Sequence, residues 1–176
     1  IGENIFFGGY DGRFYCISQK GEKIWRLPVR GSVHSRPFLL DDNIFFGVKG
    51  GHLYKINTDG EKEWSFPINA PITSSPVVWE DTIFFGGWDN TVYALDMQGR
   101  PRWKFRTNDI IFSIAMHEGN LFFGSYDKNF YCVSPKGELK WKFPTSSPIS
   151  SQPCFEGERL FFGGYDSTFY CLSLNG

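Results

Sequence analysis

The hydrophobic positions of this chain follow one pattern that occurs five times. Each copy contains Phe-Phe-Gly, a short polar segment and a second run in which apolar and polar residues alternate. The copies begin at Phe6, Phe45, Phe84, Phe122 and Phe161, so that successive starts are 39, 39, 38 and 39 residues apart. A fixed period of this length is typical of stacked units that cannot bury their apolar faces alone. We therefore expect a repeat protein.

The third copy shows what one unit contains. Its apolar runs predict four strands, at 74–79, 82–87, 91–96 and 101–105. The last two runs alternate between apolar and polar residues, which is the period of a half-buried strand. The pairs Asp89-Asn90 and Gln98-Gly99 separate the second, third and fourth runs and favour tight turns. Each unit is therefore predicted to be an antiparallel four-stranded meander.

Four-stranded units at this period favour an all-β fold, and within that class a β-propeller, because radial repetition leaves only short sheet edges exposed. No segment shows the 3.6-residue apolar period of a helix. The expected units are 1–34, 35–73, 74–111, 112–150 and 151–176, which is about 4.5 repeats. The first and last units contain only three expected strands each, so we expect the chain to form part of a larger propeller.

Glycine and tryptophan recur at fixed places in the copies. The glycine that ends each Phe-Phe-Gly and a second glycine after the third expected strand fall where we expect the chain to turn sharply. A tryptophan stands four residues beyond this second glycine in the first four copies, at Trp25, Trp64, Trp103 and Trp141. We expect these indoles to lie on the outermost strands and to dock each unit against the next.

Taken together, Ser-x-Pro, the glycine-ended second run, Tyr-Ala-Leu-Asp and Gly-x-x-x-Trp-x-Phe resemble the PQQ-like, or quinoprotein-type, propeller repeat. The resemblance covers essentially the whole chain and is closest over 74–105. It implies a propeller whose tryptophans are docking residues. The family includes quinone-dependent alcohol dehydrogenases, an outer-membrane assembly lipoprotein and sensor domains fused to kinases, so the fold alone does not assign a function.

The dehydrogenase members imply PQQ and Ca²⁺ at the propeller centre, acidic and amide ligands, and a disulfide between adjacent cysteines. No two cysteines are adjacent in this sequence. A Ca²⁺ site needs several converging oxygen ligands, whereas few carboxylates lie near the expected inner-strand positions, which are Phe38, Val77, Ala115 and Cys154. The three histidines occupy non-equivalent repeat positions. We therefore expect no catalytic residue, no cofactor and no metal.

The composition limits the partner classes. The formal net charge is −1, which gives no field to attract nucleic acid, and no run of 18 apolar residues predicts insertion into a membrane. Cys16, Cys132 and Cys171 share one repeat position, whereas Cys154 stands apart. We expect all four to be small buried hydrophobic residues. Free thiols favour a reducing, cytoplasmic compartment over the alternatives, periplasm or cell surface.

Candidate partner-binding residues occupy the turn between the second and third expected strands, where the copies differ. The first residue of this turn is aromatic in four copies and lysine in one: Tyr10, Lys49, Trp88, Tyr126 and Tyr165. Tyrosine and tryptophan are favoured at interfaces, so this set predicts a recognition surface. The alternative is that the aspartate after the aromatic residue nucleates the turn and that the ring only covers it.

Two further positions are candidates. Between the third and fourth units the chain loses one residue, and Phe112-Ser113-Ile114 takes the place of Ser-x-Pro. His117, just beyond, therefore differs from its counterparts and is a candidate channel or partner contact. Arg36 precedes an expected inner strand and is a candidate anion-binding residue.

The sequence therefore predicts a non-catalytic propeller scaffold that binds a protein or peptide within a larger multidomain protein. One alternative is a sensor or small-ligand-binding propeller coupled to an effector domain, and another is a fragment of a PQQ-dependent dehydrogenase. If three-stranded terminal units leave sheet edges open, self-association through those edges is expected.

Overall fold

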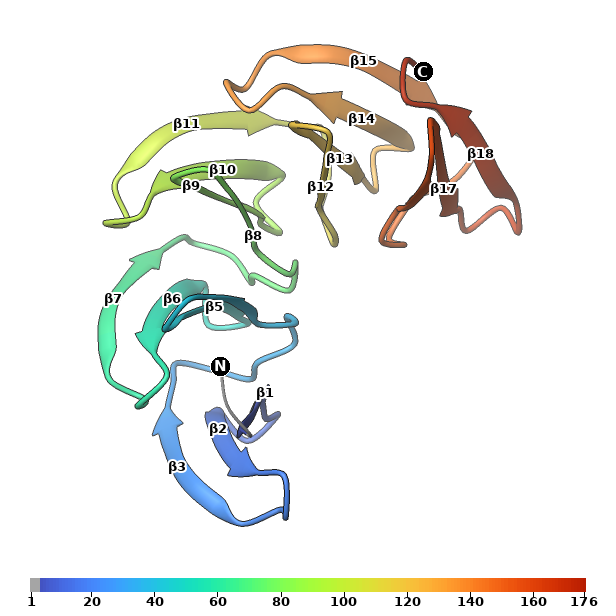
Figure 1. The fold of residues 1–176 in the computed structure, drawn as a ribbon. Coiled ribbons are helices and arrows are strands. Elements are labelled where there is room, and N and C mark those ends of the chain that lie inside the picture. Colours follow the sequence, from blue (N-terminus) through green and yellow to red (C-terminus); the bar gives the residue numbers. More distant parts are fainter. Residues whose placement is uncertain (1–3) are drawn as a thin grey trace. The chain divides into compact units, whose positions relative to one another are not determined.

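The structure, a computed structural model, describes residues 4–176, and this part of the chain consists of β-strands and connections without a helix (Figure 1). The strands form five antiparallel sheets, three with four strands and two with three. The predicted all-β fold is therefore confirmed. No helix in the described residues has the length and apolar character needed to span a membrane.

Each sheet corresponds to one sequence copy and is called a blade below. The first blade contains β1 (Asn4–Gly8), β2 (Arg13–Ser18) and β3 (Lys23–Pro28), and the second contains β4 (Phe38–Leu40), β5 (Asn43–Val48), β6 (His52–Asn57) and β7 (Lys62–Pro67). The third contains β8 (Val77–Trp79), β9 (Thr82–Gly86), β10 (Thr91–Asp96) and β11 (Pro101–Arg106). The fourth contains β12 (Ala115–His117), β13 (Asn120–Gly124), β14 (Asn129–Val133) and β15 (Leu139–Pro144), and the fifth contains β16 (Cys154–Glu156), β17 (Arg159–Gly163) and β18 (Phe169–Ser173).

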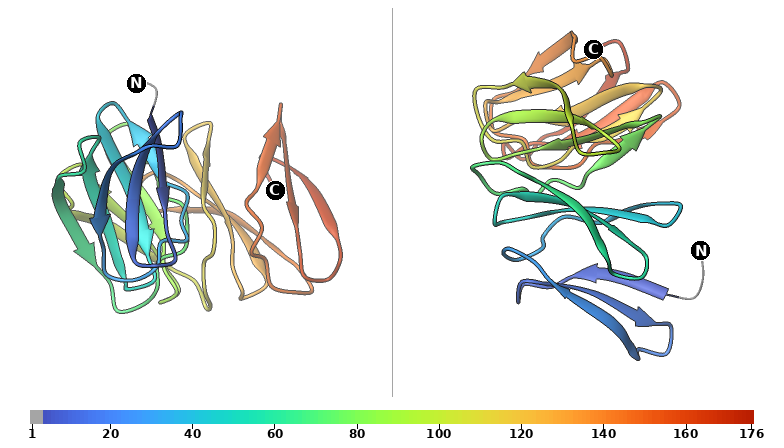
Figure 2. Two further views of the ribbon diagram at one scale, coloured as in Figure 1. Left: turned by 90° about the horizontal axis from the view of Figure 1, so that it is seen from below. Right: turned by 90° about the vertical axis from the view of Figure 1, so that its left-hand side faces the viewer.

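The chain divides into two compact units, Ile1–Pro76 and Val77–Gly176. The first unit holds the first and second blades, and the second unit holds the other three. Within every blade the strands pair in chain order, and every sheet is twisted (Figure 2). The first strand of each four-stranded blade is only three residues long.

Consecutive phenylalanines point to opposite faces of a strand, so a Phe-Phe pair can pack on both sides of its blade. In the fourth blade, Phe123 packs in a core with Phe84 and Val92 of the third blade. Phe122, on the other face, packs in a core with Leu160 of the fifth blade. All of these side chains are buried. In the fourth blade the pair therefore contributes to one core on each side, and this blade alone would leave both faces open.

The glycine of Phe-Phe-Gly has a different role from the one expected. We predicted a turn, but Gly124 is the last residue of β13 and does not have a positive φ. A Cβ at Gly124 would lie 2.2 Å from Cγ2 of Ile149, in the connection after β15. The glycine is thus needed for close packing. The second glycine does turn the chain, since Gly137 has a φ of 87°.

The expectation that all four cysteines are buried is wrong for two of them. Cys16 and Cys132 are buried, whereas Cys154 and Cys171 are exposed, and all four are free thiols. Cys132 belongs to the core between the fourth and fifth blades. Cys171 holds the equivalent position in the fifth blade, but no further sheet of the described residues covers that face.

Candidate functional site

Turns and connections meet at one end of each blade. In the fourth blade, the Tyr126 N–H donates to the Ile110 carbonyl (3.0 Å), and the Thr145 N–H donates to the Lys128 carbonyl (2.8 Å). These bonds tie the β13–β14 turn to the connection that enters the blade and to the one that leaves it. We call this end of the blades the loop face, and we name it separately for each of the two compact units.

The aspartate of the turn fixes the loop face in four of the five copies. Its carboxylate accepts a hydrogen bond from the hydroxyl of the tyrosine four residues later. The pairs are Asp11 with Tyr15 (2.5 Å), Asp89 with Tyr93, Asp127 with Tyr131 (2.7 Å) and Asp166 with Tyr170 (2.7 Å). Sequence reasoning missed these pairs, although the constant Asp-x-x-x-Tyr spacing was visible.

The same carboxylates also bind the backbone and the preceding connection. Asp127 Oδ1 accepts from the Asn129 N–H (3.0 Å), and Asp127 Oδ2 accepts from the Asn108 N–H (3.0 Å). Asp166 accepts from Ser146 Oγ (2.9 Å), and its bonds, that from Tyr170 above all, lower the pKa of this carboxyl to about 2. Burial and the hydrogen bond to Asp127 raise the pKa of the Tyr131 phenol. The predicted turn-nucleating geometry of aspartate is thus present.

The aromatic residues of the second unit form one continuous row across three blades. Ring centroids are 5.3 Å apart between Trp88 and Phe112, 4.7 Å between Phe112 and Tyr126, and 5.8 Å between Tyr126 and Tyr165. Trp88, Phe112 and Tyr126 are partly exposed, and Tyr165 is 63% exposed. We call Trp88, Phe112, Tyr126 and Tyr165 the aromatic row.

Phe112 joins two turn residues that would otherwise lie apart, and sequence reasoning did not select it as a site residue. It lies in the irregular connection between the third and fourth blades. Its repeat equivalents are His34, Thr73 and Ser150. A phenylalanine at a position that carries polar side chains in the other copies was the available signal.

Polar contacts fix the exposed end of the row. The Tyr126 hydroxyl donates to the Tyr165 hydroxyl (3.1 Å), and Ser150 Oγ donates to the same oxygen (3.3 Å). The bond to Tyr165 is the main cause that raises the pKa of Tyr126 to about 12. The bonds that Tyr165 accepts, from Ser150 first, lower the pKa of its phenol. Tyr165 is thus the acceptor in both of these bonds.

The candidate residues of the first unit, Tyr10, Lys49 and Arg36, are exposed. Tyr10 is 80% exposed and packs edge-on against His34, with ring centroids 4.3 Å apart. The Lys49 N–H donates to the Ser32 carbonyl (2.9 Å), and the side chain is exposed. Burial, and then the charge of Lys49, lower the pKa of His34. Arg36 is exposed, and its N–H donates to Ser75 Oγ (2.9 Å).

His117 lies away from the aromatic row. It is the last residue of β12, at the end of the fourth blade opposite the turn that carries Tyr126. Its ring stacks on Phe155 of the fifth blade, with centroids 4.2 Å apart and planes 5° apart. The buried His117 Nε2 has no hydrogen-bond partner among the described residues.

Three of the repeated tryptophans contact the following blade. The indole N–H of Trp25 donates to the Thr58 carbonyl (3.0 Å), that of Trp103 to the Pro135 carbonyl (2.8 Å) and that of Trp141 to the Leu174 carbonyl (2.9 Å). Each ring lies over the turn glycine of that blade: Gly60, Gly137 and Gly176. Trp64 occupies the equivalent position on β7.

A family model described as outer membrane protein assembly factor BamB matches residues 2–106 and 88–176, which together span nearly the whole sequence. The chain belongs to this BamB family. The predicted PQQ-like propeller resemblance is thereby confirmed. No curated protein matches the sequence.

Solved structures show the same fold as this BamB-family chain. BamB from Moraxella catarrhalis superposes with a TM-score of 0.84 at 15% identity, over 97% of this chain and 56% of that one. The computationally designed Ika8 protein superposes with a TM-score of 0.84 at 14% identity, over 98% of this chain and 56% of that one. The chain thus has a β-propeller fold and spans about half the length of these two structures.

Within the described residues of the BamB-family chain, no group of three or more His, Cys, Asp or Glu side chains is placed to hold a metal ion. The described loop-face residues include aromatic groups, hydrogen-bonding groups and the cationic side chain of Lys49. The turn carboxylates of Asp127 and Asp166 are engaged by tyrosine and backbone donors.

Proposed function

We propose that the chain is a non-catalytic propeller scaffold that binds an extended segment of a partner protein along the aromatic row. The observation that carries this proposal is the unbroken contact of four partly exposed rings across three blades. Large amphipathic side chains supply much of the binding energy at protein interfaces. A row of this kind matches the length of an extended peptide better than a compact ligand.

The row is held in place before any partner arrives. The turns that carry Trp88, Tyr126 and Tyr165 are each fixed by an aspartate–tyrosine hydrogen bond. A surface that does not have to be ordered on binding loses less conformational entropy. Tyr165, which is 63% exposed, can present both its ring and its hydroxyl to the bound segment.

The family description, outer membrane protein assembly factor, supports a protein partner over a small-molecule substrate. We propose Tyr10, Lys49 and Arg36 as further partner contacts in the first unit, and His117 as a separate contact in the fourth blade. The repeated tryptophans, Trp25, Trp64, Trp103 and Trp141, are proposed as docking residues that hold consecutive blades together.

A partner-binding assay with matched variants tests the row. The double variant Trp88→Ala/Tyr126→Ala is compared with Phe169→Ala, which removes an aromatic side chain that is 71% exposed and lies outside the row. We expect the double variant to lose capture of the partner while Phe169→Ala retains it. Thermal unfolding of each variant shows that it is folded. Equal capture by a folded double variant would refute the proposal.

A further inference from the structure

The second blade lacks the carboxylate that fixes the loop face in the other four copies. Its turn reads Lys49-Gly50-Gly51-His52, so glycine stands where the other copies have aspartate, and lysine stands where they have an aromatic residue. This turn therefore has no negative charge and one positive charge, whereas each sister turn has one aspartate, balanced by a cation in two of them, at Arg13 and Lys128.

The preceding connection takes up the space of the missing side chain. A Cβ at Gly50 would lie 1.6 Å from the Arg30 carbonyl oxygen, so the backbone of Arg30 excludes any side chain there. The tyrosine of this copy, Tyr54, has no aspartate partner and accepts a hydrogen bond from the Arg30 N–H instead (3.2 Å). The glycine that replaces aspartate in this copy therefore allows Arg30 to lie close to Lys49 and His52.

These residues line a depression of ≈ 560 Å³ on the loop face of the first unit. Its lining includes Arg30, Lys49 and His52 together with residues 67–71, and His52 pairs with Pro67 across β6 and β7. No aspartate or glutamate lines it. Arg30 and Lys49 are exposed, and neither belongs to an ion pair within the described part of the chain. His52 Nδ1 donates to the Gly50 carbonyl (3.0 Å), which orients the ring.

The chain as a whole is slightly acidic, so its composition does not explain why two unpaired cations lie in one depression. Arginine and lysine together favour an anion, and the arginine fork favours a planar carboxylate. The rest of the lining is largely apolar, with Pro67, Ile68, Ala70 and Pro71, and suits the aliphatic part of a peptide. The depression is also much larger than a single inorganic anion requires.

We propose that the depression between Arg30, Lys49 and residues 67–71 binds a carboxylate side chain of an acidic peptide segment. This proposal rests on the proposed function. It adds that the bound partner segment is acidic. The site lies in the first unit and uses none of the residues of the aromatic row, so the two sites are tested separately.

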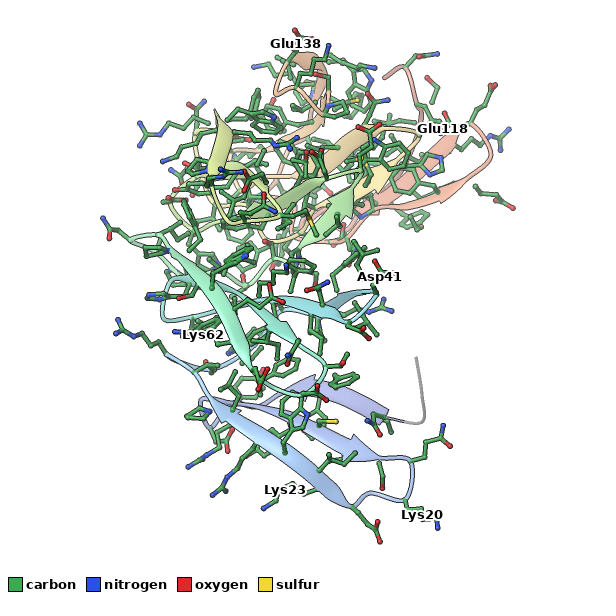
Figure 3. The ribbon with its side chains drawn as sticks, turned by 60° about the vertical axis from the view of Figure 1, so that its left-hand side comes forward. Lys20, Lys23, Asp41, Lys62, Glu118 and Glu138 are labelled. Atoms are coloured by element: carbon green, nitrogen blue, oxygen red, sulfur yellow. The ribbon has the colours of Figure 1, made fainter. Side chains whose placement is uncertain are left out.

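Titration of the protein with hexaglutamate, hexaglutamine and inorganic phosphate tests the site by isothermal calorimetry at low salt. The test variant is Arg30→Gln/Lys49→Gln. The control is Lys20→Gln/Lys23→Gln, which removes two exposed charges next to the β2–β3 turn that point away from the first blade (Figure 3). Circular dichroism melting shows that both variants are folded.

We expect hexaglutamate to bind the protein and the control variant alike, and the test variant about tenfold more weakly. Added salt should weaken this binding, and hexaglutamine should not bind. The assignment is overturned by no hexaglutamate binding at about 1 mM, by equal binding to the test variant, or by phosphate binding alone. Hexaglutamate binding that survives in Trp88→Ala/Tyr126→Ala shows that this site stands even if the aromatic row fails its own test.

Discussion

Tyr126 donates a hydrogen bond to the hydroxyl of Tyr165, the residue 39 positions later that fills the same place in the next blade (3.1 Å). The sequence period thus becomes a direct contact between equivalent side chains. This contact joins the last two residues of the aromatic row, at its exposed end. It also leaves a measurable signature, because each phenol alters the ionisation of the other.

Replacing Tyr165 with phenylalanine should lower the pKa of Tyr126 from about 12 toward the ordinary tyrosine value of about 10. The reason is that the hydrogen bond to Tyr165 is the largest cause of the raised pKa. Ultraviolet-monitored alkaline titration of both proteins measures the change. Tyr10→Phe is the control, since Tyr10 is 80% exposed and has no tyrosine partner in the described residues. An unchanged Tyr126 titration in Tyr165→Phe would show that the contact is not formed.

The same bond predicts a loss of stability at high pH. The folded-state pKa of Tyr126 is raised, so its neutral form is favoured by folding. Its contribution is complete below pH about 10 and is lost as the pH rises through about 12. Urea unfolding at several alkaline pH values should therefore show a steeper decline for the wild type than for Tyr126→Phe. Parallel declines would contradict this account.

The lowered pKa of Asp166 predicts a loss of stability at low pH. Its pKa is lowered to about 2, so its contribution is present above the unfolded value near 4 and is lost as the pH falls toward 2. Asp166→Asn should flatten this acid decline in urea unfolding. Asp41→Asn is the control, because the Asp41 side chain is exposed and has no hydrogen bond or ion pair within the described residues (Figure 3). The prediction fails if both variants decline with pH as the wild type does.

Trp103 should stabilise the protein through the hydrogen bond of its indole N–H as well as through the apolar area that the ring buries. Trp103→Phe removes the bond to the Pro135 carbonyl and should lower the free energy of unfolding by about 1 kcal/mol. Trp79→Phe is the control, because Trp79 is 39% exposed and its indole N–H has no hydrogen-bond partner in the described part of the chain. It should change stability by less than about 0.5 kcal/mol. Equal effects in guanidinium unfolding would argue against a role for the N–H bond.

Gly124 and Gly163 occupy the same motif position and allow a matched test of close packing. Gly124→Ala would force a Cβ to 2.2 Å from Ile149 and should destabilise the protein by about 1–3 kcal/mol. At Gly163 the nearest atom would lie 4.0 Å away, so Gly163→Ala should change stability by less than about 0.5 kcal/mol. Chemical unfolding of both variants measures the difference, and similar losses would contradict the packing explanation.

The fold was predictable because its signals are local. Alternation in 91–96 and 101–105 predicted two strands, and the structure has β10 and β11 there. The turn at Asp89-Asn90 was also predictable, since Asn90 has the positive φ that this residue type tolerates. Such preferences act within a few residues and repeat with the period.

The candidate site was only partly predictable. The turn aromatics Trp88, Tyr126 and Tyr165 were selected from the sequence, but nothing in their spacing showed that Phe112 would join them. The basic depression was missed because Arg30 lies in the connection after β3, whereas Lys49 lies in the β5–β6 turn. Arg30 approaches the turn only because Gly50 leaves room for its backbone.

The sequence by itself determined the repeat, the strands and the turns, because hydrophobic alternation and turn-forming residues act over short distances along the chain. The tertiary structure decided which faces are covered, as the exposed Cys171 shows, and which side chains meet across blades. Those outcomes depend on contacts between residues about 20 to 40 positions apart, which the register of neighbouring blades sets and no local pattern specifies.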